Sequence, residues 1–250
     1  MTSWVPEWED VKEQPIYLQI ADSLAKRILS GELAVGERLP SERQLAEELG
    51  VSRMTVRQAL LALRRSGLVQ SRRGQGSFVS GPKLEQPVDI LTGFSDNILA
   101  KGMKPGARVL SAEQRLASQS VARSLGLPVG EPVWRLHRLR LADNMPAALE
   151  ISYFPARLFP DLNRHDLEGR SVYAILAEEY GVRLAWARQC LEPTVARPEE
   201  ASLLGIPVGA PLMLVERTTF DETERIVEFA KDLYRGDCFR FVSCSKVAAR

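Results

Sequence analysis

The sequence predicts an α+β protein with two parts: an N-terminal helical domain that ends in a β-hairpin, and a C-terminal antiparallel sheet with helices packed against it. Apolar residues recur at helical spacing over residues 16–63, and a glycine-rich segment between two short β-type runs follows. The remainder contains a duplicated strand–turn–strand segment. These three observations predict a change from helices to sheet along the chain.

The composition limits the class of protein. The chain has 250 residues, enough for two domains, and its 33 Lys+Arg against 32 Asp+Glu give a formal net charge of +1. No apolar run reaches the roughly 20 residues that span a bilayer. The acidic start, MTSWVPEWED, lacks the basic and apolar regions of a secretion signal, and the three cysteines form no C-x-x-C pair. We expect a cytoplasmic protein with reduced cysteines, without a metal site or a membrane span.

Three helices are expected in the first 67 residues. The first repeats an apolar residue at every fourth position: Ile16, Ile20, Leu24 and Ile28. The second begins after Ser41, which forms a capping-box pattern with Gln44, and ends at Gly50. The third begins after Ser52 and ends at Gly67, with Val56, Leu60 and Leu63 facing inward. Two helices joined by a short glycine-containing turn predict a helix-turn-helix.

A basic hairpin is expected next, over LVQSRRGQGSFVS, with its tip at Arg73–Gly76. The G-x-G in this segment could indicate a phosphate-binding loop, but such a loop precedes a helix, whereas a strand follows here. Residues 81–89, GPKLEQPVD, are polar, contain two prolines and lack periodicity. We therefore expect an N-terminal domain over 1–80, a linker over 81–89 and a second domain over 90–250.

The charge distribution indicates a DNA-binding surface. Residues 49–84 contain seven basic side chains and no Asp or Glu, although the whole chain is nearly neutral. Arg53 and Arg57 fall one turn apart on the third helix, where guanidiniums reach phosphates or guanine edges if the helix enters the major groove. The alternative is that these arginines only solvate an exposed helix face. Six of them on a helix-turn-helix and hairpin, with no acid nearby, favour DNA.

The second part contains an internal duplication. SLGLPVGEPVWRLHRLRL, from Ser124, is similar to LLGIPVGAPLMLVERTTF, from Leu203. Each copy continues into a turn with an aspartate and a second strand with a glutamate, Glu150 in one copy and Glu228 in the other. Two copies are too few for a solenoid, so they predict a pseudo-symmetric antiparallel sheet.

One face of this sheet is expected to hold charged groups. Strand alternation puts Arg138 and Arg140 on one face, about 7 Å apart, with Glu150 opposite them across the hairpin. The same alternation puts Glu228 and Tyr234 on one face of the second copy, and we expect Glu228 to occupy the position comparable to Glu150. Two guanidiniums suit a phosphate or carboxylate, and carboxylates suit sugar hydroxyls or an amine. The alternative is an Arg–Glu salt bridge on a solvated face.

An enzyme is the competing class of function. His137 and His165 are the only histidines, and neither has a motif that links it to a nucleophile or a metal-ligand set. Alternation also points His137 away from the arginine pair. We therefore expect no enzyme activity. A purely architectural DNA-binding protein would leave the large second domain without a role.

The N-terminal domain resembles the winged-helix domain of the GntR transcriptional regulators. The resemblance runs from Pro15 to Val79 and is carried by PIYLQI, LAVGERLPSERQLAEELGVSRMTVRQALLALRRSGLV and GQGSFV. It implies a winged helix-turn-helix that binds operator DNA. The positions that it implies for DNA contact are Arg43, Ser52, Arg53, Thr55, Arg57, Arg73 and Gly74.

The C-terminal domain resembles the UTRA ligand-sensing domain of the HutC subfamily. The matching pieces are LTGFSDNILAKGMKPGARVL, RLHRLRLADNMPAALEISYFP, SVYAIL and IVEFAKDLYRGDCFRF, in this order. The resemblance implies a fold like that of chorismate lyase and a pocket for a small effector. The positions that it implies for effector binding are Arg138, Arg140, Glu150, Ser171, Glu228 and Tyr234. The loop from Thr92 to Ser95 is expected to add backbone and hydroxyl donors.

Together these features predict a homodimeric transcriptional regulator, most simply a repressor, that binds palindromic operator DNA and responds to a small anionic metabolite. No cofactor is expected. The segment GFSDNILAKGMKPG and the arginine pair are most similar to those of regulators of amino-sugar use. N-acetylglucosamine 6-phosphate or glucosamine 6-phosphate is therefore the expected effector, with other sugar phosphates or small carboxylates as alternatives, and a lyase-like enzyme as a further one.

Overall fold

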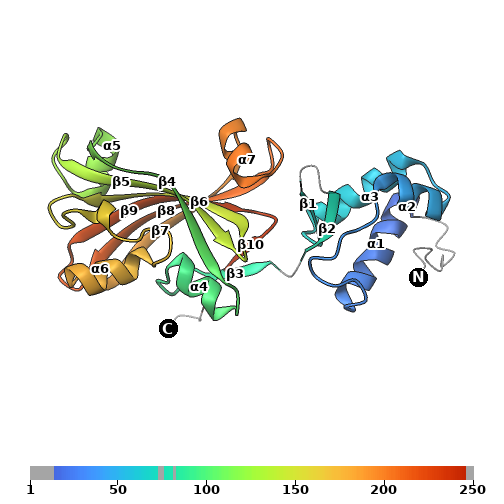
Figure 1. Cartoon of the computed structure of the whole chain (residues 1–250), viewed down its shortest axis with the longest axis horizontal. Coiled ribbons are helices and arrows are strands. Elements are labelled where there is room, and N and C mark those ends of the chain that lie inside the picture. The colour runs from blue at the N-terminus through green and yellow to red at the C-terminus, as the bar shows by residue number, and fades with distance from the viewer. Residues whose placement is uncertain (1–13, 73–75, 81–82, 246–250) are drawn as a thin grey trace, which may run out of the picture. The chain divides into compact units, whose positions relative to one another are not determined.

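The structure is a computed structural model that describes residues 14–72, 76–80 and 83–245. The chain divides into two compact units between Lys83 and Leu84. Figure 1 shows three helices and a hairpin in the N-terminal unit, and a large sheet with helices in the C-terminal unit. Each unit is described by itself below.

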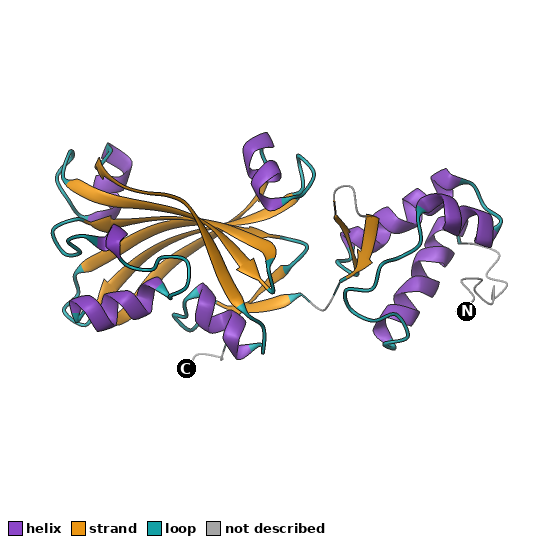
Figure 2. Cartoon of the chain, viewed as in Figure 1, coloured by secondary structure: helices purple, strands orange, loops and turns teal. Residues whose placement is uncertain are grey.

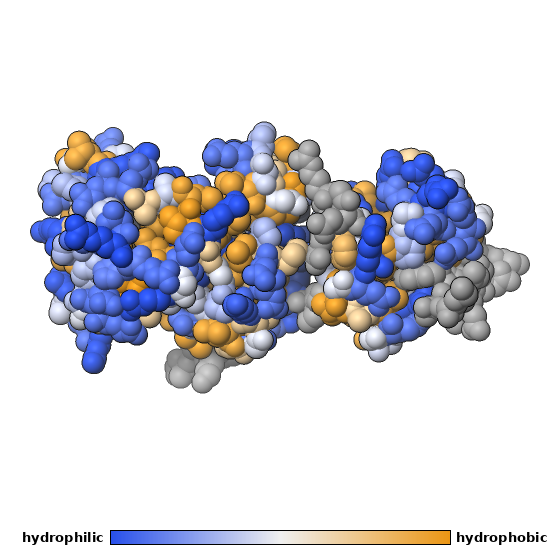
Figure 3. Space-filling model, in the orientation of Figure 1, coloured by the Kyte–Doolittle hydropathy of each residue, from blue (hydrophilic) through white to orange (hydrophobic). Residues whose placement is uncertain are grey.

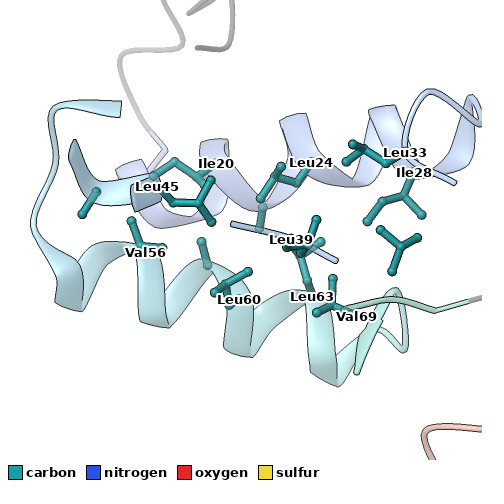
Figure 4. Close-up of a cluster of buried hydrophobic side chains, with 14 residues drawn as sticks. Ile20, Leu24, Ile28, Leu33, Leu39, Leu45, Val56, Leu60, Leu63 and Val69 are labelled. Atoms are coloured by element: carbon teal, nitrogen blue, oxygen red, sulfur yellow. The ribbon is translucent and has the colours of Figure 1, made fainter. Parts of the chain in front are cut away.

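The N-terminal unit packs its helices around one apolar core. Its elements are α1 (Ile16–Leu29), α2 (Glu42–Leu49), α3 (Arg53–Arg65) and the antiparallel hairpin β1 (Val69–Arg72) and β2 (Gly76–Val79). Figure 4 shows the core side chains of α1 facing those of α3, with Leu39 and Leu45 between them. The predicted stripe of α1 is confirmed from Ile20 onward, whereas Ile16, the first helical residue, is 53% exposed. The apolar face therefore begins one turn later than predicted.

The predicted ends of α2 and α3 are confirmed. Ser41 Oγ accepts from the backbone N–H of Gln44 at 3.2 Å, and Gln44 Oε1 accepts from the N–H of Ser41 at 3.0 Å. Gly50 ends α2 with φ 66°, a left-handed conformation that favours glycine. Ser52 then caps α3. This short turn fixes the angle at which α3 leaves α2.

The C-terminal unit is built on a six-stranded antiparallel sheet in the order β4-β5-β6-β9-β8-β7. Figure 2 shows this sheet with short helices on both sides. The elements up to the first hairpin are β3 (Leu84–Pro87), α4 (Phe94–Ala100), β4 (Pro105–Leu116), α5 (Gln119–Leu125), β5 (Pro132–Ala142) and β6 (Met145–Pro155). Those that follow are a 3₁₀ turn (Leu162–Arg164), α6 (Val172–Tyr180), β7 (Leu184–Val195), α7 (Pro198–Leu204), β8 (Pro211–Asp221), β9 (Ile226–Arg235) and β10 (Phe239–Val242).

The helices cover opposite faces of the sheet in pairs. α4 packs its Phe94 and Ile98, and α6 its Ile175, into clusters with the face that contains Leu136 and Ala148. On the other face, α5 packs in a cluster that includes Val133, and α7 packs in one that includes Leu139. Figure 1 shows α5 and α7 above the sheet and α4 and α6 below it. The predicted α+β sheet with packed helices is thus confirmed.

The segment expected to be a linker belongs in part to the C-terminal unit. β3 pairs in parallel with β10, from Leu84 opposite Phe239 onward. Asp89 accepts hydrogen bonds from Ser243 Oγ at 2.8 Å and from the N–H of Cys244 at 2.6 Å. The linker prediction is therefore wrong for residues 84–89. Polar residues and a terminal proline are compatible with an edge strand, so composition alone could not distinguish an edge strand from a linker.

The duplicated hairpins are related by an approximate twofold axis. β6 and β9 lie side by side at the centre, with Ile151 opposite Lys231. Both hairpins carry a register shift near the turn, after Arg140 in β5 and after Thr219 in β8. Arg138 lies opposite Glu150, and its counterpart Arg217 lies opposite Ala230. The duplication thus places two arginines at equivalent positions on one face.

The sheet has two long edge strands. β4 and β7 each have 12 residues, and each has a neighbouring strand of the large sheet on one side only. In the face that Figure 3 shows, hydrophobic residues of the C-terminal unit gather near the middle of the sheet, where β4 crosses the view, inside a border of hydrophilic residues. A long edge strand beside apolar surface is suited to contact with another chain.

Candidate DNA-reading surface and effector pocket

The start of α3 carries four of the seven residues expected to contact DNA. Ser52 Oγ accepts from the backbone N–H of Thr55 at 3.1 Å and lies 2.8 Å from Thr55 Oγ1. Arg53 and Arg57 follow one turn apart, and both are exposed. The N-cap therefore sets the first turn, and the two guanidiniums project from it on the solvent side.

Arg57 is held by a carboxylate from α2. Its Nη2 donates to Glu42 Oε2 at 2.9 Å, and its Nε lies 3.2 Å from the same oxygen. The hydrogen bond with Arg57 lowers the pKa of the Glu42 carboxyl, while partial burial acts in the opposite direction. The contact of Nη1 is with Met54 Sδ at 3.9 Å, a weak acceptor. One edge of the guanidinium is thus bound, and its outer end remains for another partner.

The remaining expected DNA contacts lie on α2 and the hairpin. Arg43 is exposed on α2, with its Nη1 3.6 Å from Glu47 Oε1. Arg73 and Gly74 lie outside the described residues. The adjoining strand β2 is linked to α3, because Arg64 Nη2 donates to Ser77 Oγ at 2.9 Å.

A pocket opens on the sheet face that α4 and α6 cover. The space between its lining residues, with the open solvent at its mouth included, is about 280 Å³. Six of the eight residues expected to bind an effector line it: Ser95, Arg138, Arg140, Glu150, Ser171 and Glu228. The other lining residues are Gly93, Phe94, Val172, Tyr173 and Arg217. The structure therefore brings together residues that are up to 135 positions apart in the sequence, from Gly93 to Glu228.

Two helix starts form one wall of the pocket. A Cβ at Gly93 would lie 3.3 Å from Tyr173 Cδ2, so glycine allows the start of α4 to approach that of α6. Ser171 is the N-cap of α6, but its hydroxyl makes no capping hydrogen bond. The first backbone N–H groups of a helix lack intrahelical partners and favour an anion. This wall therefore offers hydrogen-bond donors to a ligand.

The predicted arginine pair faces one carboxylate. Arg138 Nε donates to Glu150 Oε2 at 2.9 Å, and Arg138 Nη1 donates to the carbonyl oxygen of Leu167 at 3.1 Å. Arg140 Nη1 donates to the same Glu150 oxygen at 3.2 Å, and Nη2 donates to Ser95 Oγ at 2.8 Å. All three charged side chains are at least nine-tenths buried. The Arg–Glu pairing is thus real, but it lies in a pocket rather than on a solvated face.

The second copy contributes another charged set. Glu228 accepts from Tyr173 Oη and Thr219 Oγ1, each at 2.8 Å, and from Ser152 Oγ at 3.0 Å. Arg217 Nη2 donates to Asp232 Oδ2 at 3.0 Å, and its Nε lies 3.6 Å from Glu228 Oε2. Arg217 Nε and Asp232 Oδ1 have no hydrogen-bond partner among the described residues. The pocket therefore contains donors that its own carboxylates do not saturate.

Two buried carboxyl groups have pKa values shifted in opposite directions, because burial raises both but the nearby charges differ. Burial alone would raise the pKa of Glu150, but the charges of Arg138 and Arg140 outweigh it and lower that pKa to about 2. Burial, together with the nearby charges of Glu150 and Glu228, raises the pKa of Asp232 to about 8 against the opposing charge of Arg217. At neutral pH Asp232 is therefore mainly protonated. Three guanidiniums then face at most two carboxylates, which leaves the site with a positive excess.

Sequence reasoning misplaced two residues and missed others. Thr92 and Tyr234 do not line the pocket; Tyr234 is buried against the rings of Phe239 and Phe241. Glu228 does not occupy the position of Glu150. Ala230 lies opposite Arg217, the counterpart of Arg138, and Glu228 lies opposite Thr219, two residues nearer the turn. Arg138 and Glu150 are 12 residues apart in the sequence, whereas Arg217 and Ala230 are 13 apart, and this one-residue difference hid the register.

Arg217 and Tyr173 were missed although the sequence held a signal for each. Arg217 aligns with Arg138 in the quoted duplicate, and Tyr173 follows two residues after Ser171. Neither histidine lines the pocket, and His165 Nε2 is hydrogen-bonded to Tyr180 Oη at 2.9 Å. Over the residues that the structure describes, no cluster of three His, Cys, Asp or Glu side chains is placed to hold a metal ion. None of the described helices is long and apolar enough to cross a membrane.

A helix-turn-helix with exposed arginines and a separate sensing domain define a class of protein: DNA-binding transcriptional regulators. Residues 16–79 match the model of bacterial regulatory proteins of the gntR family, and residues 100–240 match the UTRA domain. The chain therefore belongs to the gntR family of bacterial regulatory proteins, in the HutC-type group that carries a UTRA domain. These relatives are transcriptional regulators rather than enzymes.

Individual relatives cover nearly the whole chain. The HTH-type transcriptional repressor NagR of Bacillus subtilis is 40% identical over 228 residues, 91% of this chain and 93% of that protein. The mannosyl-D-glycerate transport/metabolism system repressor MngR of Escherichia coli is 30% identical over 91% of this chain and 95% of that protein. The crystal structure of PhnF from Mycobacterium smegmatis has a TM-score of 0.65 at 29% identity, and the match covers 91% of this chain and 99% of that one.

Proposed function

We propose that this protein is a repressor whose affinity for a palindromic operator changes when an amino-sugar phosphate, glucosamine 6-phosphate or N-acetylglucosamine 6-phosphate, binds the C-terminal pocket. The observation that carries the proposal is the buried arginine pair, Arg138 and Arg140, in a pocket that also presents carboxylates. The 40% identity to a repressor named NagR supports the choice of sugar. Other sugar phosphates and small carboxylates are the alternative effectors.

The chemistry of the pocket suits a ligand with one anionic end. Arg140 Nε is buried without a hydrogen-bond partner in the described residues, and the Ser171 hydroxyl makes no cap bond. A phosphate has three acceptor oxygens that such donors satisfy, and guanidiniums bind it through paired N–H groups. Glu228 carries acceptor oxygens that suit the hydroxyls or the amine of a sugar. The positive excess left by protonated Asp232 favours the anion.

Operator binding is assigned to α2, α3 and the hairpin of two chains. One recognition helix reads few base pairs, so a twofold dimer on a palindrome doubles the contact, with helices about 34–36 Å apart or a multiple of that spacing. The C-terminal unit is the proposed dimer contact, because two basic N-terminal units would repel each other. Arg53→Ala and Arg57→Ala should each weaken operator binding by about 1–3 kcal/mol.

Isothermal titration calorimetry of the full chain tests the proposed effector. Glucosamine 6-phosphate, N-acetylglucosamine 6-phosphate and their unphosphorylated sugars are titrated separately. The proposal requires the phosphorylated sugars to bind much more tightly, since the arginine pair holds the phosphate. Equal affinity for the phosphorylated and unphosphorylated sugars would refute the phosphate assignment. Binding of a different sugar phosphate or of a small carboxylate instead would select the alternative effector.

A further inference from the structure

The carboxylate of Glu42 lies beside the arginines of the DNA-reading surface. The DNA-reading surface has no Asp or Glu over residues 49–84, yet α2 directs Glu42 onto the recognition helix α3. A carboxylate near DNA repels phosphates and so weakens binding in general. Its ion pair with Arg57 therefore points to a role that involves Arg57 itself.

The contact uses one edge of the guanidinium fork. Glu42 Oε2 accepts hydrogen bonds from Nε and Nη2 of Arg57, at 3.2 and 2.9 Å. A guanidinium has five N–H donors, so the second Nη2 hydrogen and those of Nη1 remain, and Nη1 contacts only the weak acceptor Met54 Sδ, at 3.9 Å. The end of the fork formed by Nη1 and Nη2 is the part that pairs with O6 and N7 of guanine. The edge bound by Glu42 and the end needed for guanine do not compete.

The carboxylate is itself held in place. Glu42 is the first residue of α2, directly after the Ser41 N-cap, whose reciprocal bonds with Gln44 fix this turn. The Glu42 side chain is 25% exposed and that of Arg57 is 54% exposed. A fixed carboxylate thus limits the rotamers of a long side chain that would otherwise sample many.

We propose that Glu42 is a positioning residue for base recognition, which holds Arg57 so that the Nη1/Nη2 end of its guanidinium is directed at one guanine of the operator. This inference rests on the proposed DNA-reading role of Arg57. A purely structural role for the pair, as a tie between α2 and α3, is the competing explanation. An exposed ion pair contributes little to stability, so its loss would leave the fold intact. The structural explanation therefore predicts that the Glu42 variants choose bases as the unaltered protein does.

Base discrimination by the full-length protein separates the two explanations. Duplexes that bind the unaltered protein are selected from a random library, and each guanine of the selected site is then replaced in turn. Arg57→Ala identifies the position at which discrimination depends on Arg57. Affinities are measured for Glu42→Gln and, as a second variant, Glu42→Ala. Glu48→Gln is the matched control, because Glu48 is exposed on the same helix and forms no ion pair with a described residue.

The expected result is a loss of discrimination at the Arg57-dependent position, on the order of tenfold, in both Glu42 variants. Binding to unrelated DNA should stay equal or rise, since a negative charge is removed, and Glu48→Gln should discriminate like the unaltered protein. No further loss is expected when Glu42→Gln is combined with Arg57→Ala.

Two contrary results have different meanings. If Arg57→Ala loses discrimination while both Glu42 variants keep it, the positioning role is wrong and the DNA-reading role of Arg57 stands. If Arg57→Ala itself keeps full discrimination at every position, the proposed reading role of Arg57 fails, and the positioning role fails with it.

Discussion

Arg138 and Arg217 occupy equivalent positions in the two copies of a duplicated hairpin, and both guanidiniums line one pocket. Their surroundings differ, since Arg138 lies opposite Glu150 and Arg217 lies opposite Ala230. The acidic partner of Arg217 is instead Asp232, two residues beyond Ala230 on β9. One duplication has thus produced an arginine on each side of the central strands, with acids at unequal positions. This asymmetry suits a ligand whose two ends differ.

Loss of the Glu150 carboxylate should destabilise the protein. Glu150→Ala leaves Arg138 and Arg140 buried without their shared partner, and breaking a buried ion pair typically costs about 3–5 kcal/mol. Denaturant unfolding of the full chain measures this change. Glu113→Ala is the matched control, because Glu113 is an exposed partner of Arg115 on β4 and should cost about 1 kcal/mol or less. An equally small change for Glu150→Ala would mean that water already reaches the two guanidiniums.

Arg140→Met should weaken effector binding strongly while operator binding is retained. Methionine replaces the apolar stem but removes the donors that approach Glu150 and Ser95. Since a hydrogen bond to a charged group contributes about 1.5–3 kcal/mol, a loss of at least about tenfold in effector affinity is expected. Arg135→Met is the matched control, because Arg135 is also an arginine of β5 but lies on the opposite face of the sheet. Similar calorimetric losses for both variants would show that the effect is not specific to the pocket.

Effector affinity should fall as the pH rises through about 8. The pKa of Asp232 is raised to about 8, so this carboxyl is mainly neutral at pH 7 and becomes charged by pH 9. The phosphate is already dianionic across this range, because its second pKa is about 6. The new negative charge on Asp232 therefore opposes the anion at high pH.

Asp232→Asn supplies the control for this pH dependence. The amide resembles the protonated carboxyl and still accepts from Arg217, so the variant should bind the effector equally at pH 7 and pH 9. Calorimetry at both pH values, with a check that the variant remains folded, makes the comparison. The same fall in affinity for Asp232→Asn as for the unaltered protein would assign the titration to another group.

The C-terminal unit should require residues 84–89. A fragment of residues 84–250 retains β3 and the bonds of Asp89, whereas a fragment of residues 90–250 loses both. We expect the longer fragment to unfold at a higher temperature and to form a dimer at micromolar concentration. Thermal unfolding and light scattering of the two fragments test this. A monomeric longer fragment would place the dimer contact elsewhere, and equal melting temperatures would mean that the β3–β10 pairing adds no stability.

Local signals in the sequence predicted the N-terminal unit well. The Ser41 cap, the Gly50 end and the Ser52 cap depend on neighbouring residues, so each was readable without the rest of the fold. The arginine pair of β5 was also readable, because strand alternation alone puts both side chains on one face. The resemblance to a known family then placed Ser171, which no local pattern indicated.

Register and long-range pairing were not readable in the same way. Glu228 looked equivalent to Glu150, but the longer second turn places it opposite Thr219. The parallel pairing of Leu84 with Phe239 joins residues far apart in the chain, and nothing in a polar segment with two prolines indicates such a partner. Arg217 was visible only through an alignment of the two copies that compared individual positions.

The most direct test of the account is the affinity of the full chain for its selected DNA duplex with and without glucosamine 6-phosphate or N-acetylglucosamine 6-phosphate. Fluorescence anisotropy of a labelled duplex measures it, with the unphosphorylated sugars as controls. Coupling between an effector and a second ligand is typically about 5- to 150-fold, and a change in this range is predicted for a phosphorylated sugar alone. An operator affinity that stays the same at saturating concentrations of both sugar phosphates would contradict the account.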